Sequence, residues 1–165
     1  MPSDVLQADL QRSDFTPTIS VYADICNADP SSAKALAGAY FAAYPPGIAA
    51  GTLAEAQAEM EETFAHEYGE LLDTASFVAV HQGKPIGAIF VVEKSIWDAT
   101  LSGPFIIDLF IEPKHQGNGL GHALISAAMS ACKKRGARTL SLRIGDGTSG
   151  AAQKLYTQLG FRKLA

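Results

Sequence analysis

The chain has 165 residues, enough for one domain that buries roughly two thirds of its unfolded surface. A hydrophobic content of 47% and a charged content of 18% are those of an ordinary globular protein. No apolar run reaches the roughly 18–20 residues of a membrane span, and the first ten residues lack the basic-then-apolar order of a secretory signal. Cys26 and Cys132 lie outside any C-x-x-C pattern, so we expect a reduced, cytoplasmic protein with two unpaired thiols.

The net charge is −4, but the charges are divided unevenly along the chain. Residues 1–112 hold 16 of the 17 acidic residues and four basic ones, whereas residues 113–165 hold nine basic residues and one acid. A basic half suits a polyanionic ligand and an acidic half a cationic one, with chance clustering on solvated faces as the open alternative. The acidic first half argues against nucleic-acid binding, which needs a broad basic surface.

Residues 1–17 are polar and include Pro2 and Pro17, so they are expected to form a flexible leader. Residues 18–165 are expected to form a single domain. The first strand of this domain is predicted at residues 18–22, where apolar and polar residues alternate.

Two helices are predicted next. Asp29-Pro30 is typical of a helix start, and the pattern continues to about Tyr44, where two prolines stop it. Thr52 and Glu55 form a capping box for a second helix, whose apolar face recurs at helical spacing as far as Leu72.

After Asp73 the period changes to that of strands. Residues 77–81 and 86–93 are rich in strand-forming residues and are joined by Gln82-Gly83-Lys84, which predicts a hairpin. Residues 105–112 predict a central strand.

Helix and strand then alternate to the end of the sequence. A helix is predicted over residues 119–135, because basic residues followed by a glycine are a typical helix stop. A strand at residues 139–144, a helix at 150–159 and a short strand from Gly160 follow. The predicted order is β-α-α-β-β-β-α-β-α-β, an α/β (α+β) fold with a mixed sheet and helices on its faces.

The strongest functional signal lies where the central strand meets the next helix. Residues 105–121 read F-I-I-D-L-F-I-E-P-K-H-Q-G-N-G-L-G. A strand, a glycine-rich turn and a helix N-terminus form an anion site, because glycines let the backbone approach and the first-turn N–H groups have no intrahelical partner. The turn resembles the Gln/Arg-x-x-Gly-x-Gly/Ala signature of GNAT-superfamily N-acetyltransferases, whose loop holds the pyrophosphate of acetyl-coenzyme A (acetyl-CoA). The matching residues are Gln116, Gly117, Asn118, Gly119, Leu120 and Gly121.

A second motif supports the resemblance. Ala152-x-x-Leu155-Tyr156-x-x-x-Gly160-Phe161 is similar to a pattern of the same family, one helix and one strand after the first motif. Short glycine patterns recur by chance, but the two motifs in this order form a specific signal. The resemblance implies the GNAT fold, with a mostly antiparallel sheet, from about residue 18 to the C-terminus.

The resemblance also assigns roles to particular residues. In the family, backbone groups of the central strand bind the pantetheine arm and polarise the thioester carbonyl, and the corresponding positions are Leu109, Phe110 and Ile111. The tyrosine before the Gly-Phe pair often protonates the departing thiolate, which corresponds to Tyr156. A tyrosine with the ordinary pKa of about 10 is protonated at neutral pH. The open alternative is that Tyr156 only packs against the sheet and hydrogen-bonds the sulfur.

Asp108 is the predicted general base. It lies inside an apolar run, where an unpaired carboxylate is costly and where burial raises a carboxyl pKa towards useful values. An ion pair with Arg143 of the next strand is the structural alternative. Glu93 and Glu112 end neighbouring strands, His81 lies at a hairpin edge, and some family members activate the amine through water alone.

The sequence departs from the family pattern near its end. Ser149 stands where many relatives have an Asn that contacts the cofactor, so this contact would depend on a hydroxyl. Only four residues follow Phe161, where relatives usually continue into a further strand. The sheet edge is therefore expected to be open, cut short, or paired with a second subunit in a homodimer.

Two other motifs are incomplete and do not predict a function. Residues 145–150 spell G-x-G-x-x-G, which is typical of NAD binding, but no second β-α unit and no acidic residue ~20 positions on follow. His66-Glu67 lacks the second histidine of a zinc motif, so no metal is expected.

The sequence therefore predicts an acetyl-CoA-dependent N-acetyltransferase that moves an acetyl group to a primary amine by direct attack in a ternary complex. Cys132 lies mid-helix on an apolar face, which does not suggest an acyl-cysteine step. The acidic half favours a cationic acceptor, such as a polyamine, an aminoglycoside-like compound or a peptide lysine or N-terminus. Neither a nucleic acid nor a membrane is expected as a partner. A non-catalytic domain of the same fold that senses CoA is the alternative from another class.

Overall fold

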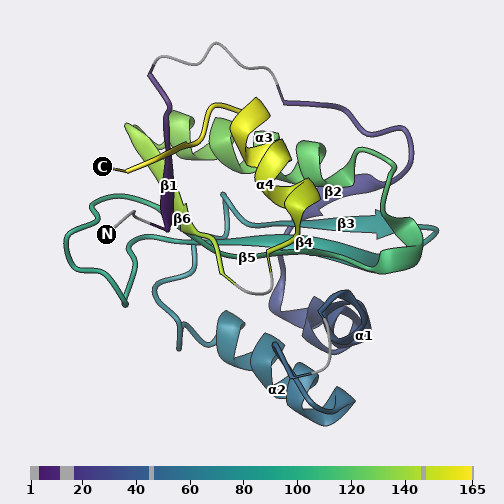
Figure 1. The fold of residues 1–165 in the computed structure, drawn as a ribbon. Coiled ribbons are helices and arrows are strands. Elements are labelled where there is room, and N and C mark those ends of the chain that lie inside the picture. Colours follow the sequence, from purple (N-terminus) through teal and green to yellow (C-terminus); the bar gives the residue numbers. More distant parts are fainter. Residues whose placement is uncertain (1–3, 12–16, 45–46, 146–147, 165) are drawn as a thin grey trace.

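A computed structural model describes residues 4–11, 17–44, 47–145 and 148–164 (Figure 1). Over these ranges the chain forms a seven-stranded sheet in the order β2-β3-β4-β5-β6-β1-β7, antiparallel except where β5 and β6 pair in parallel. The strands are β1 (Val5–Asp9), β2 (Asp24–Asn27), β3 (Phe77–His81), β4 (Lys84–Val92), β5 (Phe105–Ile111), β6 (Thr139–Arg143) and β7 (Arg162–Lys163). The helices are α1 (Ala33–Ala43), α2 (Leu53–Phe64), α3 (Leu120–Lys134) and α4 (Gly150–Gln158), with 3-10 turns η1 (Pro30–Ser32) and η2 (Pro113–His115).

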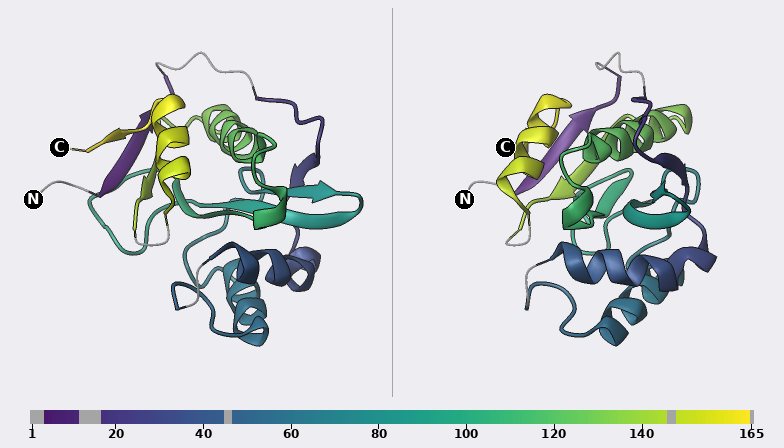
Figure 2. Two further views of the ribbon diagram at one scale, coloured as in Figure 1. Left: turned by 45° about the vertical axis from the view of Figure 1, so that its right-hand side comes forward. Right: turned by 90° about the vertical axis from the view of Figure 1, so that its right-hand side faces the viewer.

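Helices cover both faces of the sheet, as Figures 1 and 2 show. Leu124 of α3 belongs to a buried cluster on one face, and Leu36 and Tyr40 of α1 belong to a second cluster on the other. Successive residues of a strand point to opposite faces, so Ile89 joins the first cluster and Phe90 the second. The predicted mixed, mostly antiparallel sheet between helices is confirmed.

The N-terminal part of the chain differs from the prediction in two places. The flexible leader is wrong for residues 5–9, which form β1 between β6 and β7. Leu6, Ala8 and Leu10 are buried there at the period of a strand, a signal that the polar neighbours and two prolines obscured.

The strand predicted at residues 18–22 is also wrong. After residue 17, strand pairing begins only at Asp24, in β2, which runs antiparallel to β3 at the edge of the sheet. Ile19 and Val21, the apolar side of the alternating pattern, face solvent with exposed fractions of 88% and 104%. The alternation therefore marks an irregular segment, bent at residues 21–23, that has no strand partner in the described part of the chain.

Both predicted helix starts are confirmed. The Asp29 carboxylate accepts a hydrogen bond from the Ser31 N–H at 2.8 Å, and the Thr52 hydroxyl oxygen accepts one from the Glu55 N–H at 3.1 Å. The second helix ends at Phe64, earlier than its apolar spacing predicts. The backbone is left-handed at His66, which stops the helix before it reaches Leu72.

The sheet opens at its centre. Phe105 and Ile106 pair with β6, but the rest of β5 has no partner on that side among the described residues. The β4–β5 register shifts at the same level, because Phe90 pairs with Asp108 and Val91 with Ile106, so Ile107 is an extra residue in a bulge. The second half of β5 therefore presents its backbone to a gap beside β6.

Candidate active site

The glycine-rich turn forms an open cradle at the start of α3. Gly117 and Gly119 have φ values of +83° and +76°, the left-handed region that glycine adopts without strain. A Cβ atom added at either glycine would meet no atom of the described residues within 4 Å, which leaves space over the turn for a ligand. The unpaired N–H groups of the first helical turn make this position favourable for an anion such as a pyrophosphate.

Two side-chain amides stabilise the turn by hydrogen bonds to backbone carbonyl groups. The Gln116 amide donates to the Ile111 carbonyl at 3.0 Å, and the Asn118 amide donates to the His115 carbonyl at 3.0 Å. Both amides thus hold the conformation of the turn through backbone carbonyls. Asn118 is not among the residues that line the adjacent cleft.

Gly121 has a packing role. A Cβ atom there would lie 2.8 Å from Cδ2 of Leu155 on α4 and 3.7 Å from Cδ1 of Ile111 on β5. Because carbon atoms do not approach to 2.8 Å, the third glycine of the motif lets α4 lie close to α3 and β5.

A cleft of about 800 Å³ extends from this turn along the open half of β5 to α4. It brings together eleven of the twelve residues that the sequence predicted for the site. They are Asp108, Leu109, Phe110, Ile111, Gln116, Gly117, Gly119, Leu120, Gly121, Ser149 and Tyr156.

Ser149 acts at the start of α4. Its hydroxyl oxygen accepts a hydrogen bond from the Ala152 N–H at 3.0 Å, so it is the N-cap of that helix. The capping oxygen lines the cleft, and its hydroxyl proton is the polar group that it offers to a ligand.

Asp108 is the acidic residue that faces this cleft, in the part of the chain that the structure describes. The pKa of its carboxyl is raised to about 7, because burial and the charge of Glu59 raise it more than the hydrogen bond from the Tyr44 hydroxyl lowers it. A carboxyl with a pKa near 7 is half ionised at neutral pH, which suits a group that accepts a proton during a reaction.

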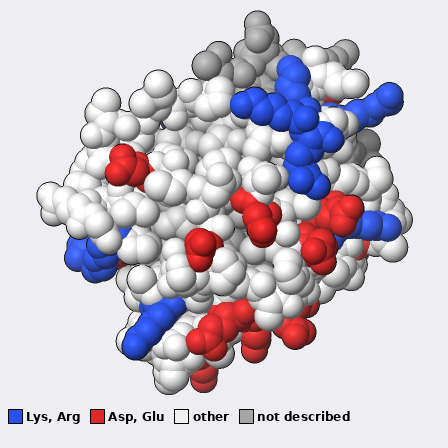
Figure 3. Space-filling view, turned by 180° about the vertical axis from the view of Figure 1, so that it is seen from behind, with Lys and Arg blue, Asp and Glu red and all other residues white. Residues whose placement is uncertain are grey.

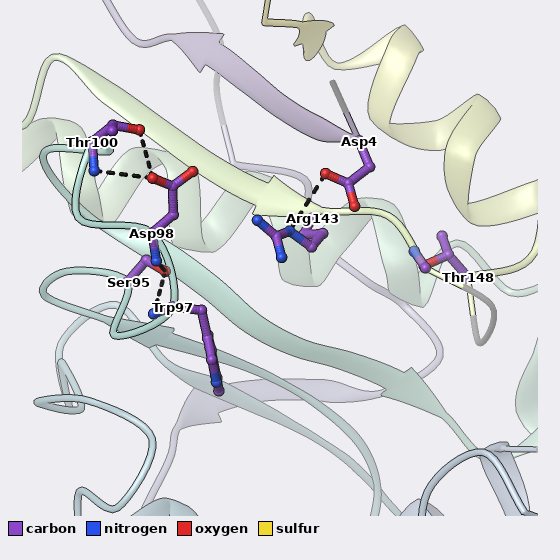
Figure 4. Close-up of polar contacts among 8 residues, drawn as sticks. Asp4, Ser95, Trp97, Asp98, Thr100, Arg143 and Thr148 are labelled. Carbon is purple, nitrogen blue, oxygen red and sulfur yellow. Dashed lines mark hydrogen bonds and ion pairs between the residues drawn. The ribbon is translucent and has the colours of Figure 1, made fainter. Parts of the chain in front are cut away.

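The alternative pairing of Asp108 with Arg143 is not what the structure has. Arg143 lies 3.5 Å (Nε to Oδ1) from Asp4, and Figure 4 shows the guanidinium beside this carboxylate. Both side chains are about half exposed, so the pair contributes little to stability. Tyr44 is the actual partner of Asp108.

The other candidate bases lie outside the cleft. Glu112 pairs with Lys114 at 3.3 Å, and His81 stacks on Tyr22 with 4.3 Å between ring centroids. Neither residue lines the cleft, and nor does the exposed Glu93. Asp108 is therefore the best-placed of the candidates.

Tyr156 lies on α4 with its ring packed edge-on against Phe161, 5.5 Å between centroids. The residue is 5% exposed, yet it lines the cleft. Burial and then the charge of Asp108 raise the pKa of Tyr156 above its ordinary value, so its hydroxyl remains protonated and can donate.

A second cavity of about 250 Å³ adjoins the first and shares Ile106, Ile107 and Arg143 with it. Trp97, which is 55% exposed, and Phe105 form its aromatic wall. Figure 4 shows Trp97 on the loop after β4, where the Ser95 hydroxyl accepts hydrogen bonds from the N–H groups of Trp97 and Asp98.

The two cysteines do not line the cleft. Cys132 is fully buried in α3, and burial raises the pKa of its thiol to about 12, so it is not a nucleophile at neutral pH. Cys26 is exposed on β2 at the far edge of the sheet.

Acidic and basic side chains gather at different corners of the molecule. Figure 3 shows most acidic groups over the lower part, where α1 and α2 lie in Figure 1, and the largest cluster of basic groups at the upper right, with further basic groups at the lower left and the right edge. Lys133 and Lys134 end α3, whose fifteen residues place them about 20 Å from the glycine-rich turn. The basic half of the sequence is therefore not concentrated at the anion cradle.

Within the described ranges, each helix is too short or too polar to cross a bilayer. Over the same residues, histidines, cysteines and carboxylates form no group of three that could hold a metal ion.

Comparison with known families decides the classification. A sequence model of the Acetyltransferase (GNAT) family matches residues 39–161. The chain belongs to this family. Acetyl-CoA is the family's acetyl donor, and the open cradle, the large cleft and the exposed backbone of β5 fit such a molecule.

The relatives include proteins of known name. The [ribosomal protein bS18]-alanine N-acetyltransferase of Escherichia coli is 32% identical over 103 residues, which are 62% of this chain and 64% of that protein. An uncharacterized N-acetyltransferase of Methanocaldococcus jannaschii also matches, over 38% of its length. The chain therefore spans less than two thirds of the length of each of these two relatives.

Solved structures share the fold. A GCN5-related N-acetyltransferase from Sphaerobacter thermophilus has a TM-score of 0.71 at 18% identity, over 97% of this chain and 47% of that one. The aminoglycoside N-acetyltransferase AAC(6')-Iy, solved in complex with CoA, has a TM-score of 0.64 at 21% identity, over 92% and 94%.

Proposed function

We propose that the chain is an acetyl-CoA-dependent N-acetyltransferase that transfers the acetyl group directly to a primary amine. The observation that supports this most is the placement of Asp108 and Tyr156 in one cleft that ends at the anion cradle. One group with a pKa near 7 and one that stays protonated are what an acyl transfer to nitrogen needs.

The donor side of the cleft would bind acetyl-CoA through backbone groups. The glycine-rich turn and the first turn of α3 offer N–H groups to the pyrophosphate. Leu109, Phe110 and Ile111 carry backbone groups in the half of β5 that has no strand partner on the side of β6 among the described residues, and a pantetheine arm fits there as an added strand.

The chemistry follows from the two side chains. Acetyl-CoA supplies a thioester, and the amine nitrogen forms a bond to its carbonyl carbon while the bond from carbon to sulfur breaks. Asp108 takes the proton that the amine loses. Tyr156 donates a hydrogen bond and a proton to the sulfur, and its phenol regains a proton from solvent. Neither cysteine lines the cleft, which favours direct attack over an acyl-cysteine step.

The acceptor is proposed to be cationic. Its amine must approach Asp108, and the charge of Glu59 acts on the same carboxyl from α2. Several acidic groups lie over the lower part of the molecule in Figure 3, and acidic groups attract an ammonium group over several ångströms. The named relatives act on a ribosomal-protein alanine and on aminoglycosides, both of which are amines.

The test is amine-dependent release of CoA thiol from acetyl-CoA, with polyamines, aminoglycosides and peptides as acceptors. Tyr156→Phe is expected to lower kcat by about 10²-fold while acetyl-CoA affinity remains. Tyr40→Phe is the matched control, since Tyr40 is a buried tyrosine that does not line the cleft. Acetyl-CoA binding without turnover on any amine would instead favour a CoA-sensing domain.

A further inference from the structure

We propose that Tyr44 is a positioning residue for Asp108, which it orients in the cleft and holds ready to accept a proton. The inference rests on the proposed function, in which Asp108 takes the proton of the acceptor amine. Its basis is the hydrogen bond that the Tyr44 hydroxyl donates to Oδ1 of Asp108, between residues 64 positions apart in the chain.

The end of α1 delivers the Tyr44 side chain to this position. Ala43 is the last residue of the helix, and Tyr44 has the extended backbone values φ −107° and ψ 143°. A residue that precedes a proline avoids the helical region, and Tyr44 precedes Pro45. The chain therefore leaves the helix at Tyr44, and the phenol reaches across to β5 and lines the cleft.

Aromatic packing restricts the ring. Tyr40, one turn earlier on α1, meets Tyr44 edge-on at 5.2 Å and Phe110 of β5 edge-on at 5.2 Å. The Tyr44 hydroxyl also lies 3.4 Å from the carbonyl oxygen of Leu109, so it sits between the carboxyl group and the backbone proposed to bind the donor. A phenol fixed in this way restricts the orientations of the carboxyl group that it contacts.

The surroundings of Asp108 favour its protonated form, and the hydrogen bond from Tyr44 opposes them. The charge of Glu59 on α2 acts on this carboxyl, and Arg143 of β6 lines the same cleft. Asp108 in turn raises the pKa of three neighbouring tyrosines, which are Tyr40 of α1, Tyr44 just after that helix and Tyr156 of α4. Burial and Asp108 raise the pKa of Tyr44, so its hydroxyl keeps its proton and acts as a donor. A donor stabilises the ionised carboxyl and thereby opposes burial and Glu59, which both favour the protonated form.

The decisive variant is Tyr44→Phe, which keeps the ring and removes the donor. We expect the pKa of Asp108 to rise, moving the acid limb of the kcat/KM profile up by about one pH unit. Activity should then fall roughly five-fold at pH 7 and return close to wild type at pH 9. Tyr40→Phe is the matched control, because it makes the same change one turn away, where no hydrogen bond to Asp108 exists in the described chain, and it should leave the limb in place.

Carbon-13 NMR of the Asp108 carboxyl measures the same shift without turnover. An upward shift in Tyr44→Phe supports the role, and so does a much smaller effect of Tyr44→Phe on kcat when Asp108 is already Asn. A uniform loss of activity at all pH values, with the NMR titration unchanged, would overturn the positioning role and leave the proposed enzyme intact. A wild-type protein with no turnover on any amine would overturn the proposed function and this role with it.

Discussion

The two sides of the cleft are built by different means. The donor side, formed by the glycine-rich turn, the open half of β5 and the start of α3, depends on backbone groups and on glycine conformations. The proposed acceptor side depends on side chains from separate elements, namely Tyr44 in the cleft, Trp97 in the adjoining cavity and Glu59 of α2, whose charge acts on Asp108. A backbone site is specified by a short run of sequence, whereas a side-chain site exists only once the chain has folded.

This difference suggests that the donor side can serve many proteins of one family while the acceptor side varies. Substitutions on the two sides should therefore affect different ligands. Backbone strain on the donor side should weaken acetyl-CoA binding, and a changed charge on the acceptor side should weaken amine binding. Single substitutions can test that separation, and Asp108 belongs to both sides.

The largest effect is expected at Asp108, where the two sides meet. Asp108→Asn keeps the shape and removes the proton acceptor, so kcat at pH 8 should fall roughly 10²- to 10⁴-fold while the Kd for acetyl-CoA stays the same. Steady-state kinetics and a binding titration measure the two quantities. A variant that retains most of its kcat would remove Asp108 from the mechanism.

The same variant should be more stable than wild type above neutral pH. Asp108 has an ordinary pKa of 3.8 and a folded-state pKa of about 7, so the folded protein holds a proton that the unfolded chain has lost between these values. The contribution of Asp108 to stability is therefore full below about pH 4 and is lost as pH rises through 7. Asp108→Asn should gain a few kcal/mol relative to wild type at pH 8, and little at pH 4, in thermal or denaturant unfolding.

Asp98→Asn is the control for this gain. Asp98 is an exposed carboxyl whose pKa is held below its usual range by hydrogen bonds from Thr100. Its replacement should give no gain at pH 8. Equal stability changes for the two variants would show that burial of Asp108 has no energetic cost.

On the donor side, backbone strain should weaken acetyl-CoA binding. Gly119→Ala places a Cβ on a residue with φ of +76°, which costs about 1–2 kcal/mol, so KM for acetyl-CoA should rise about ten-fold. Gly136→Ala imposes similar strain at φ of +88°, beyond the other end of α3, and should lower stability without changing KM. Similar KM changes in both variants would mean that the turn has no special role.

The smallest effect is expected on the acceptor side. Glu59→Gln removes a charge that acts on Asp108, so the pKa of Asp108 should fall and KM for a cationic amine should rise about two- to five-fold, with KM for acetyl-CoA unchanged. Glu61→Gln is the matched control on the same helix, where the Glu61 carboxylate is exposed and accepts a hydrogen bond from Gln57. An equal effect of both variants on KM for the amine would show that the net charge of α2 matters and that the position of Glu59 does not.

The parts of the fold that were predictable are those with local causes. Gly117 and Gly119 need left-handed backbone, and Thr52 and Asp29 cap helices a few residues away, so each signal is complete within a short window. Val5–Asp9 has the alternation of a strand, but its partner β6 lies more than 130 residues later, and nothing nearby shows that it pairs. Residues 18–22 alternate equally well and find no strand partner among the described residues.

Tyr44 is the residue whose contact with Asp108 sequence reasoning missed. Its spacing from Tyr40 predicts a core position, and its contact with Asp108 depends on how α1 packs on β5. One signal was available, because a tyrosine before a proline ends a helix in an extended conformation. The direction in which its side chain then points is set by tertiary packing, as is the turning of Arg143 towards Asp4.

The most direct measurement is thermal unfolding with acetyl-CoA, CoA and NAD, each at about a hundred times a plausible Kd. Specific binding at that excess adds about 2.7 kcal/mol, which raises Tm by about 5–10 °C for a chain of this size. We predict this rise with acetyl-CoA and with CoA, a smaller rise in Gly119→Ala, and none with NAD. No rise with either coenzyme A species would contradict the proposed donor site and the transfer reaction built on it.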